Sequence, residues 1–171
     1  ANQNLSWDFV KVMRDSNLVH SVDLSRGEVP AYESDILYSR LFGKGFHNIY
    51  QPTDRELKTI DERASSPAYR KAAVSFHFIR MYKDASRLKM YKRTGRFPMV
   101  TSSTGLASLG EALREDAKFP SSRIELIQHQ GWKLVDLSKD ERVRASEILG
   151  RLPERSYESV EDVIHALGGS A

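Results

Sequence analysis

The chain has 171 residues, which is enough for one domain or for a small domain with an appendage. Its 26 basic and 23 acidic residues give a formal net charge of +3, and it contains no cysteine. The absence of cysteine excludes disulfides, thiolate metal sites and a thiol nucleophile, and it suits a reducing, cytoplasmic location. No apolar run approaches the roughly 18 residues of a membrane span, and no basic-then-apolar leader opens the chain, so a soluble protein is expected.

The first half of the sequence alternates segments of helical and of strand-like patterning. Helices are predicted where apolar residues recur at helical spacing, and strands where they alternate or form a short continuous run. A capping box at Thr53–Glu56 marks the start of one helix. The predicted elements are a helix over 5–14, strands over 18–24 and 35–42, a helix over 53–63, a strand over 72–78 and a helix from Met81.

The predicted fold is organised around the segment Asp35–Gly45. Its apolar run is interrupted only by Ser39 and Arg40 and is too short for a helix, which is typical of a strand buried on both faces. A buried guanidinium is costly unless a carboxylate or several carbonyls contact it. We therefore expect an acidic partner for Arg40, and a flexible glycine hinge after the strand.

Three polar residues lie near the ends of the three predicted strands: Asp23, Arg40 and His77. Strands that alternate with helices are expected to be parallel, with their carboxyl ends on one rim, where α/β folds place their chemistry. An Asp23–Arg40 ion pair would neutralise the guanidinium, and His77 could act beside it as an acid or base. These three are the candidate catalytic residues. The alternative is a structural salt bridge with a core histidine.

Neither a metal nor a cofactor is expected from the sequence. The five histidines show no metal-ligand spacing, and the chain contains no glycine-rich motif of the dinucleotide-binding or phosphate-loop type.

One basic cluster lies between Arg80 and Arg96 and includes a single acidic residue, Asp84. Such a run is typical of the solvated face of a helix. The alternative is an anion-binding or nucleic-acid-binding stripe. The residues of that stripe would be Arg80, Lys83, Arg87, Lys89, Lys92, Arg93 and Arg96.

The last seventy or so residues predict a run of short helices. Capping boxes or apolar stripes place the helix starts near Thr104, Ser122, Ser138 and Ser159. Two domains are therefore expected. Residues 1–97 would form an α/β domain of about three parallel strands, and residues 98–171 a small all-α module.

Four segments of the first domain carry a family resemblance. They are Val19–Asp23, Tyr38–Gly45, Thr53–Leu57 and Met81–Arg87. In order and spacing they resemble the C-terminal third of the YecE-like proteins, TIM barrels of uncharacterised function (domain of unknown function 72), with archaeal members the most similar. The resemblance covers roughly residues 5–95 and implies a partial TIM-barrel-like segment.

The chain departs from this family's pattern at the rim of the presumed active-site cleft. The family usually has a histidine where Phe42 stands and two asparagines where His77 and Phe78 stand. The resemblance therefore implies a degenerate site in which Asp23 and Arg40 are the matched polar residues.

A second resemblance covers about residues 108–167. The segments Lys118–Ile127 and Leu152–Val163 resemble a small helical domain of unknown function (family 2795). The resemblance implies that Phe119 and Tyr157 are core aromatics, and it implies no catalytic residue.

A closed barrel takes eight strands and about 250 residues, so three parallel strands would leave two sheet edges and a polar face open. The helical module, a partner chain that supplies the missing strands, or a second copy would have to cover them. We expect a binding or assembly protein with no membrane contact. The alternatives are a TIM-barrel-type enzyme acting on a phosphorylated or sugar-like substrate, and a nucleic-acid binder that uses the basic stretch.

Overall fold

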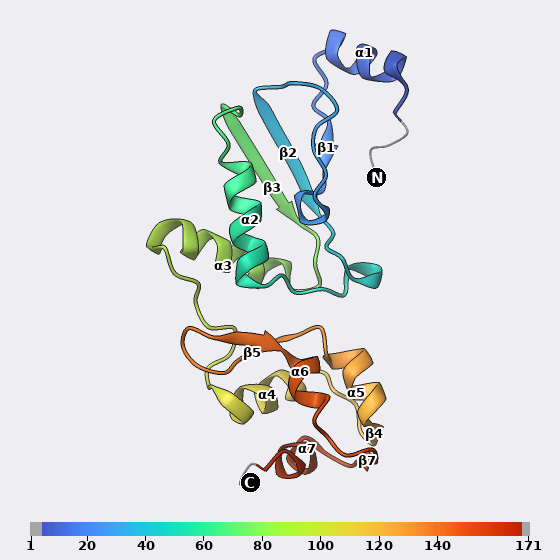
Figure 1. The fold of residues 1–171 in the computed structure, drawn as a ribbon, viewed down its shortest axis with the longest axis vertical. Coiled ribbons are helices and arrows are strands. Elements are labelled where there is room, and N and C mark those ends of the chain that lie inside the picture. The colour runs from blue at the N-terminus through green and yellow to red at the C-terminus, as the bar shows by residue number, and fades with distance from the viewer. Residues whose placement is uncertain (1–4, 169–171) are drawn as a thin grey trace. The chain divides into compact units, whose positions relative to one another are not determined.

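The computed structural model describes residues 5–168, which divide into two compact units, one up to Gly95 and one from Arg96 onward (Figure 1). Across the described residues, no helix is both long and apolar enough to span a membrane.

The first unit is built on a three-stranded parallel sheet. Its strands are β1 (Ser21–Val22), β2 (Ile36–Leu41) and β3 (Lys71–Phe76), in the order β1-β2-β3. Helix α2 (Asp54–Ala64) connects β2 to β3, and helix α3 (Met81–Thr94) follows β3 (Figure 1). This arrangement confirms the predicted partial parallel β/α segment, and the described residues close no barrel.

Local sequence signals set the helix boundaries of this unit. Helix α1 (Trp7–Asp15) begins after Ser6, whose side chain accepts the Phe9 N–H. Helix α2 begins at the predicted capping box, in which Thr53 and Glu56 satisfy each other's backbone N–H groups. Helix α3 ends at Gly95, whose φ of +75° is the left-handed conformation that favours glycine.

The two faces of the sheet have opposite characters. Leu37, Ser39 and Leu41 are buried on the face covered by α2, where Ile60 belongs to the same hydrophobic cluster as the two leucines. Tyr38 and Arg40 lie on the other face and are exposed. The prediction that β2 is buried on both faces is therefore wrong, because helices cover one side only and the Arg40 guanidinium remains in water.

The second unit contains four helices and two short strand pairs. The helices are α4 (Gly105–Arg114), α5 (Arg123–Gln130), α6 (Ala145–Leu149) and α7 (Val160–Ala166). The antiparallel pairs are β4 (Ser121–Ser122) with β7 (Ser156–Tyr157), and β5 (Leu134–Asp136) with β6 (Arg142–Arg144). The four helices match the predicted number, and the strand pairs are additional elements that no pattern in the sequence indicated.

One predicted helix start is a turn instead. The Ser138 hydroxyl accepts the N–H groups of Asp140 and Glu141, as a helix cap would, but the chain then enters β6. Helix α6 begins only at Ala145. A serine hydroxyl that accepts N–H groups two and three residues later can cap a helix or close a tight turn. Here the turn forms, because it joins the paired strands β5 and β6.

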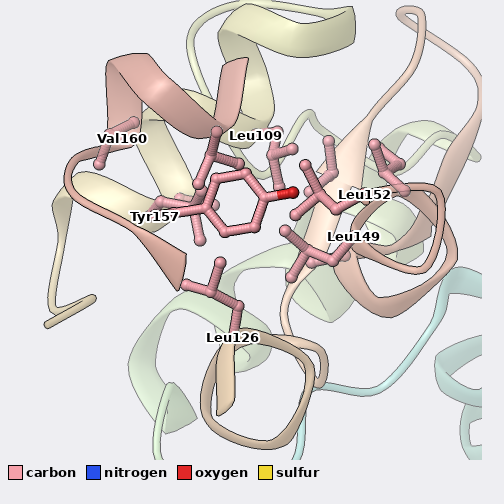
Figure 2. Packing of buried hydrophobic residues seen from close by; sticks show 12 residues of the cluster. Leu109, Leu126, Leu149, Leu152, Tyr157 and Val160 are labelled. Atoms are coloured by element: carbon pink, nitrogen blue, oxygen red, sulfur yellow. The ribbon is translucent and has the colours of Figure 1, made fainter. Parts of the chain in front are cut away.

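The core of the second unit surrounds Tyr157. Figure 2 shows its ring among Leu109, Leu126, Leu149 and Leu152. The ring is fully buried, and its hydroxyl donates to the Pro153 carbonyl at 2.7 Å. Because a buried hydroxyl without a partner is costly, this hydrogen bond is what lets a tyrosine occupy the centre of the core.

Candidate binding site at the carboxyl end of the sheet

The strand register brings a set of polar side chains to the open face of the sheet. Ser21 pairs with Tyr38, and Arg40 pairs with Ser75. Because side chains on neighbouring parallel strands share a face at paired positions, these four residues lie on the face opposite to the one that α2 covers. Arg40 and Ser75 lie near the carboxyl ends of their strands, and His77 follows β3 directly.

Arg40, Phe42 and His77 form one compact cluster at this end. Arg40 Nε donates to His77 Nε2 at 3.3 Å, and the guanidinium carbon lies 5.1 Å from the centre of the Phe42 ring. The Phe42 and His77 rings are stacked, with centres 4.8 Å apart and planes 20° apart. The Ser75 hydroxyl lies 3.2 Å from the same His77 nitrogen. Two of the three predicted catalytic residues are thus brought together.

The hydrogen bond from Arg40 sets the role of one ring nitrogen of His77. A guanidinium is only a hydrogen-bond donor, so His77 Nε2 must be the acceptor and the ring proton of this tautomer is on Nδ1. In this arrangement Nε2 is therefore occupied by Arg40. This arrangement favours a binding role over proton transfer at that nitrogen.

Asp23 does not pair with Arg40, and the predicted ion pair is wrong. Its carboxylate is 4% exposed and accepts the Ser25 N–H, the Ser25 hydroxyl and the Phe42 N–H at 2.9, 2.5 and 2.9 Å. Its closest cation is Arg26, at 3.5 Å. The reason is local: β1 ends at Val22, and Asp23 caps the short 3-10 helix that follows.

Phe42 is the site residue that sequence reasoning missed. Its backbone N–H is held by Asp23, and its ring contacts both Arg40 and His77. Phe42 therefore contacts all three predicted residues, Asp23, Arg40 and His77, which were expected to contact one another directly. The signal was present, because an aromatic residue two positions after an arginine in a strand lies on the same face.

The glycine loop after β2 is packed tightly. Gly43 has a φ of +78°, and a Cβ there would lie 2.7 Å from the Tyr50 ring. Its N–H donates to Ser25 and its carbonyl accepts from Arg26, at 3.0 and 2.7 Å. The segment predicted as a hinge is thus a closely packed turn held by two hydrogen bonds.

Glu56 fastens this loop to the start of α2. Its carboxylate accepts hydrogen bonds from the Tyr50 hydroxyl, from the Thr53 N–H and hydroxyl, and from Lys44. Burial by itself would raise the pKa of Glu56, but these hydrogen bonds outweigh it and lower the pKa from 4.5 to about 2. The network requires the ionised carboxylate.

Protonation of Glu56 in acid should therefore lower the unfolding free energy of the first unit. A folded-state pKa below the unfolded value gives stability that is complete above pH 4.5 and is lost as the pH falls toward about 2. The side chain is 26% exposed, and the shift corresponds to about 3 kcal/mol. Urea unfolding at a series of pH values should show this loss in the wild type and a flatter profile in Glu56→Gln. Parallel profiles for the two proteins would contradict the assignment.

The predicted basic stripe is not continuous on α3. Arg87 is buried between Asp84 and Asp54, at 2.8 and 2.6 Å. Lys92 pairs with Asp61 at 2.5 Å, and Arg80 is half-buried. The exposed cations of the set are Lys83, Lys89, Lys92, Arg93 and Arg96. Of the seven predicted residues, Arg87 is the one whose side chain is buried in the first unit, so it is not available to a ligand.

Among residues 5–168, no group of three or more histidine, aspartate or glutamate side chains is placed to hold a metal ion. The carboxylates around the sheet are instead engaged with backbone N–H groups, hydroxyls or cations, as described for Asp23 and Glu56.

Comparison of the chain with protein-family models, with curated proteins and with solved structures gave no match. Both family resemblances therefore stay predictions made from the sequence.

Proposed function

We propose that this chain is an assembly protein that extends its incomplete parallel sheet by strand pairing along β3. The observation that carries the proposal is the position of β3, a six-residue strand at the edge of the sheet with no described strand on its outer side. The face beside it is also open, since Tyr38 and Arg40 are exposed. An unpaired strand of this length is a template for another strand.

The backbone of β3 has an alternating set of free hydrogen-bonding groups. The N–H groups of Lys71 and His77 donate toward β2, to Asp35 and Leu41. Because successive amides in a strand point to opposite edges, the N–H groups of Ala72, Val74 and Phe76 face outward. The strand contains no proline and only one charged residue, Lys71, so it lacks the usual features that protect an edge.

The partner that this edge suits is a second copy of the chain. A two-fold axis at Val74 would pair the two β3 strands antiparallel, with Ala72 opposite Phe76 and the two Lys71 side chains at opposite ends. The resemblance to an eight-stranded barrel supports the proposal, because such a fold does not leave its strands with a free edge. A different chain that supplies strands would use the same edge.

Ala72→Pro should separate assembly from folding. Proline at this position removes an outward N–H and leaves the β2–β3 ladder intact, whereas Ala73→Pro removes an inward N–H from that ladder. We expect the wild type to form dimers by light scattering coupled to size exclusion. Ala72→Pro should be monomeric with an unchanged urea midpoint, and Ala73→Pro should lower the midpoint.

Two results would contradict the proposal. One is a wild type that remains monomeric at every concentration tested. The other is a dimer that persists in Ala72→Pro, since strand pairing at this edge needs the amides that proline blocks.

The geometry supports assembly more than the two alternatives. A barrel-type enzyme built on Asp23, Arg40 and His77 would need a free acid or base, but the Asp23 carboxylate accepts three hydrogen bonds and His77 Nε2 is bonded to Arg40. The nucleic-acid stripe is weakened, because Arg87 is buried against Asp84 and Lys92 is paired with Asp61.

A further inference from the structure

We propose that Arg40, held by His77 and Phe42, is the binding residue of an oxyanion site on the open face of the sheet. The ligand group would be a phosphate or a carboxylate gripped by the outer nitrogens of the guanidinium. The proposal does not rest on strand pairing, because the site lies on the face of the sheet and the pairing would occur at its edge.

The guanidinium is oriented by contacts within the protein, without a ligand. Its Nε donates to His77 Nε2 at 3.3 Å, and its plane lies by the Phe42 ring, 5.1 Å from the ring centre. Phe42 is itself fixed, through the stack with His77 and through the backbone hydrogen bond to Asp23. A surface arginine usually gives up several rotamers when it binds, and these contacts reduce that cost for Arg40.

The two outer nitrogens of Arg40 are the part of the group left for a ligand. In the described residues, neither of these nitrogens has a hydrogen-bond or ion-pair partner. The nearby carboxylates are engaged elsewhere: Asp23 accepts backbone N–H groups, and Glu56 accepts from Tyr50, Thr53 and Lys44. The positive charge at Arg40 is therefore not neutralised by the protein.

The chemistry of the free group selects the ligand. The outer nitrogens of a guanidinium present parallel N–H donors that match two oxygens of a phosphate or a carboxylate. Tyr38 lies two residues before Arg40 on the same face and is 38% exposed. Inorganic phosphate and acetate are the simplest probes of the two classes.

The test is a titration of the full chain with inorganic phosphate and, separately, with acetate at constant ionic strength, followed by the arginine side-chain Nε–H signals in NMR spectra. The Arg40 signal should shift with saturation. Arg40→Lys keeps the positive charge but loses the two parallel N–H donors of the guanidinium. We expect this variant to bind the probe about tenfold more weakly. Arg55 is exposed on α2, so Arg55→Lys is a control of equal charge that should bind as the wild type does.

His77→Phe tests whether the guanidinium is held in advance. This variant keeps a ring to stack on Phe42 but removes the acceptor for Arg40 Nε, so the affinity should fall several-fold while Arg40 remains. Tighter binding of phosphate would indicate a phosphorylated ligand, and tighter binding of acetate a carboxylate ligand. No saturable shift with either probe, or an equal loss of affinity in Arg55→Lys, would overturn the proposal. The Ala72→Pro variant, titrated in parallel, shows whether the site persists when strand pairing is blocked.

Discussion

Asp136→Asn is expected to lower the unfolding free energy of the second unit by about 3 to 5 kcal/mol. Asp136 is completely buried, and its Oδ1 pairs with Arg142 Nε at 2.8 Å. Its Oδ2 accepts the Val100 N–H and the Thr101 N–H and hydroxyl, at 2.8 to 2.9 Å. One carboxylate oxygen is therefore ion-paired with the Arg142 cation, and the other accepts three hydrogen bonds. An asparagine has only one acceptor oxygen, so its NH₂ group must face either Arg142 or the donors of residues 100 and 101.

Trp132 lies next to the buried strand β5 and makes this prediction measurable. With Trp7 replaced by phenylalanine, the fluorescence of Trp132 in a urea titration reports on the second unit alone, because these two are the only tryptophans. Asp140→Asn is the matched control, since Asp140 is exposed in the turn after β5 and should change stability by less than about 0.5 kcal/mol. Similar losses in both variants would show that the buried carboxylate is not the cause.

The sequence predicted the elements of the first unit because their signals are local. Thr53 and Glu56 form the expected capping box, and the alternation of strands with helices indicated the parallel order that β1, β2 and β3 adopt. These features depend on residues a few positions apart. The strands β5 and β6 were missed because each has only three residues, too few for a periodic pattern to be distinguished from a loop.

The site was predicted only in part because its contacts depend on where a strand ends. Arg40 and His77 were correctly placed on one face, which the two-residue period of strands determines. The Asp23–Arg40 pair was wrong because β1 stops at Val22, and the carboxylate then caps the next turn. If β1 continued through residue 23, the register would place Asp23 opposite Arg40, as predicted. Periodicity does not determine a strand's last residue.

Arg87 shows the same limit for charged residues on helices. In the sequence it belongs to a basic run that suggests a solvated or ligand-binding face. In the structure it connects α3 to the start of α2: its guanidinium donates to Asp84, Asp54 and the Pro52 carbonyl, at 2.8, 2.6 and 3.0 Å. A charge run does not reveal which member turns inward, because that depends on partners more than thirty residues away.

Arg87→Met is accordingly the substitution that should damage the first unit most. It removes the Arg87 guanidinium from the carboxylate of Asp84, which is 0% exposed, and it leaves the Pro52 carbonyl without the Arg87 donor. Loss of one partner from a buried ion pair costs about 3 to 5 kcal/mol. Hydrogen exchange of the Leu37 and Leu41 amides in urea measures the unfolding free energy of the first unit directly. Lys89→Met, on the exposed side of the same helix, should have little effect.

The pH dependence of that loss identifies its cause. Burial raises the pKa of Asp84 above its ordinary value, and the charge and hydrogen bond of Arg87 oppose this effect. Without Arg87 the pKa rises further, so the deficit relative to wild type should be largest at neutral pH and should shrink as acid protonates the carboxyl. The double variant Arg87→Met with Asp84→Leu removes the buried charge and should recover at least half of the lost stability. A deficit that is independent of pH and unchanged in the double variant would place the cost in lost packing, and not in an unpaired buried carboxylate.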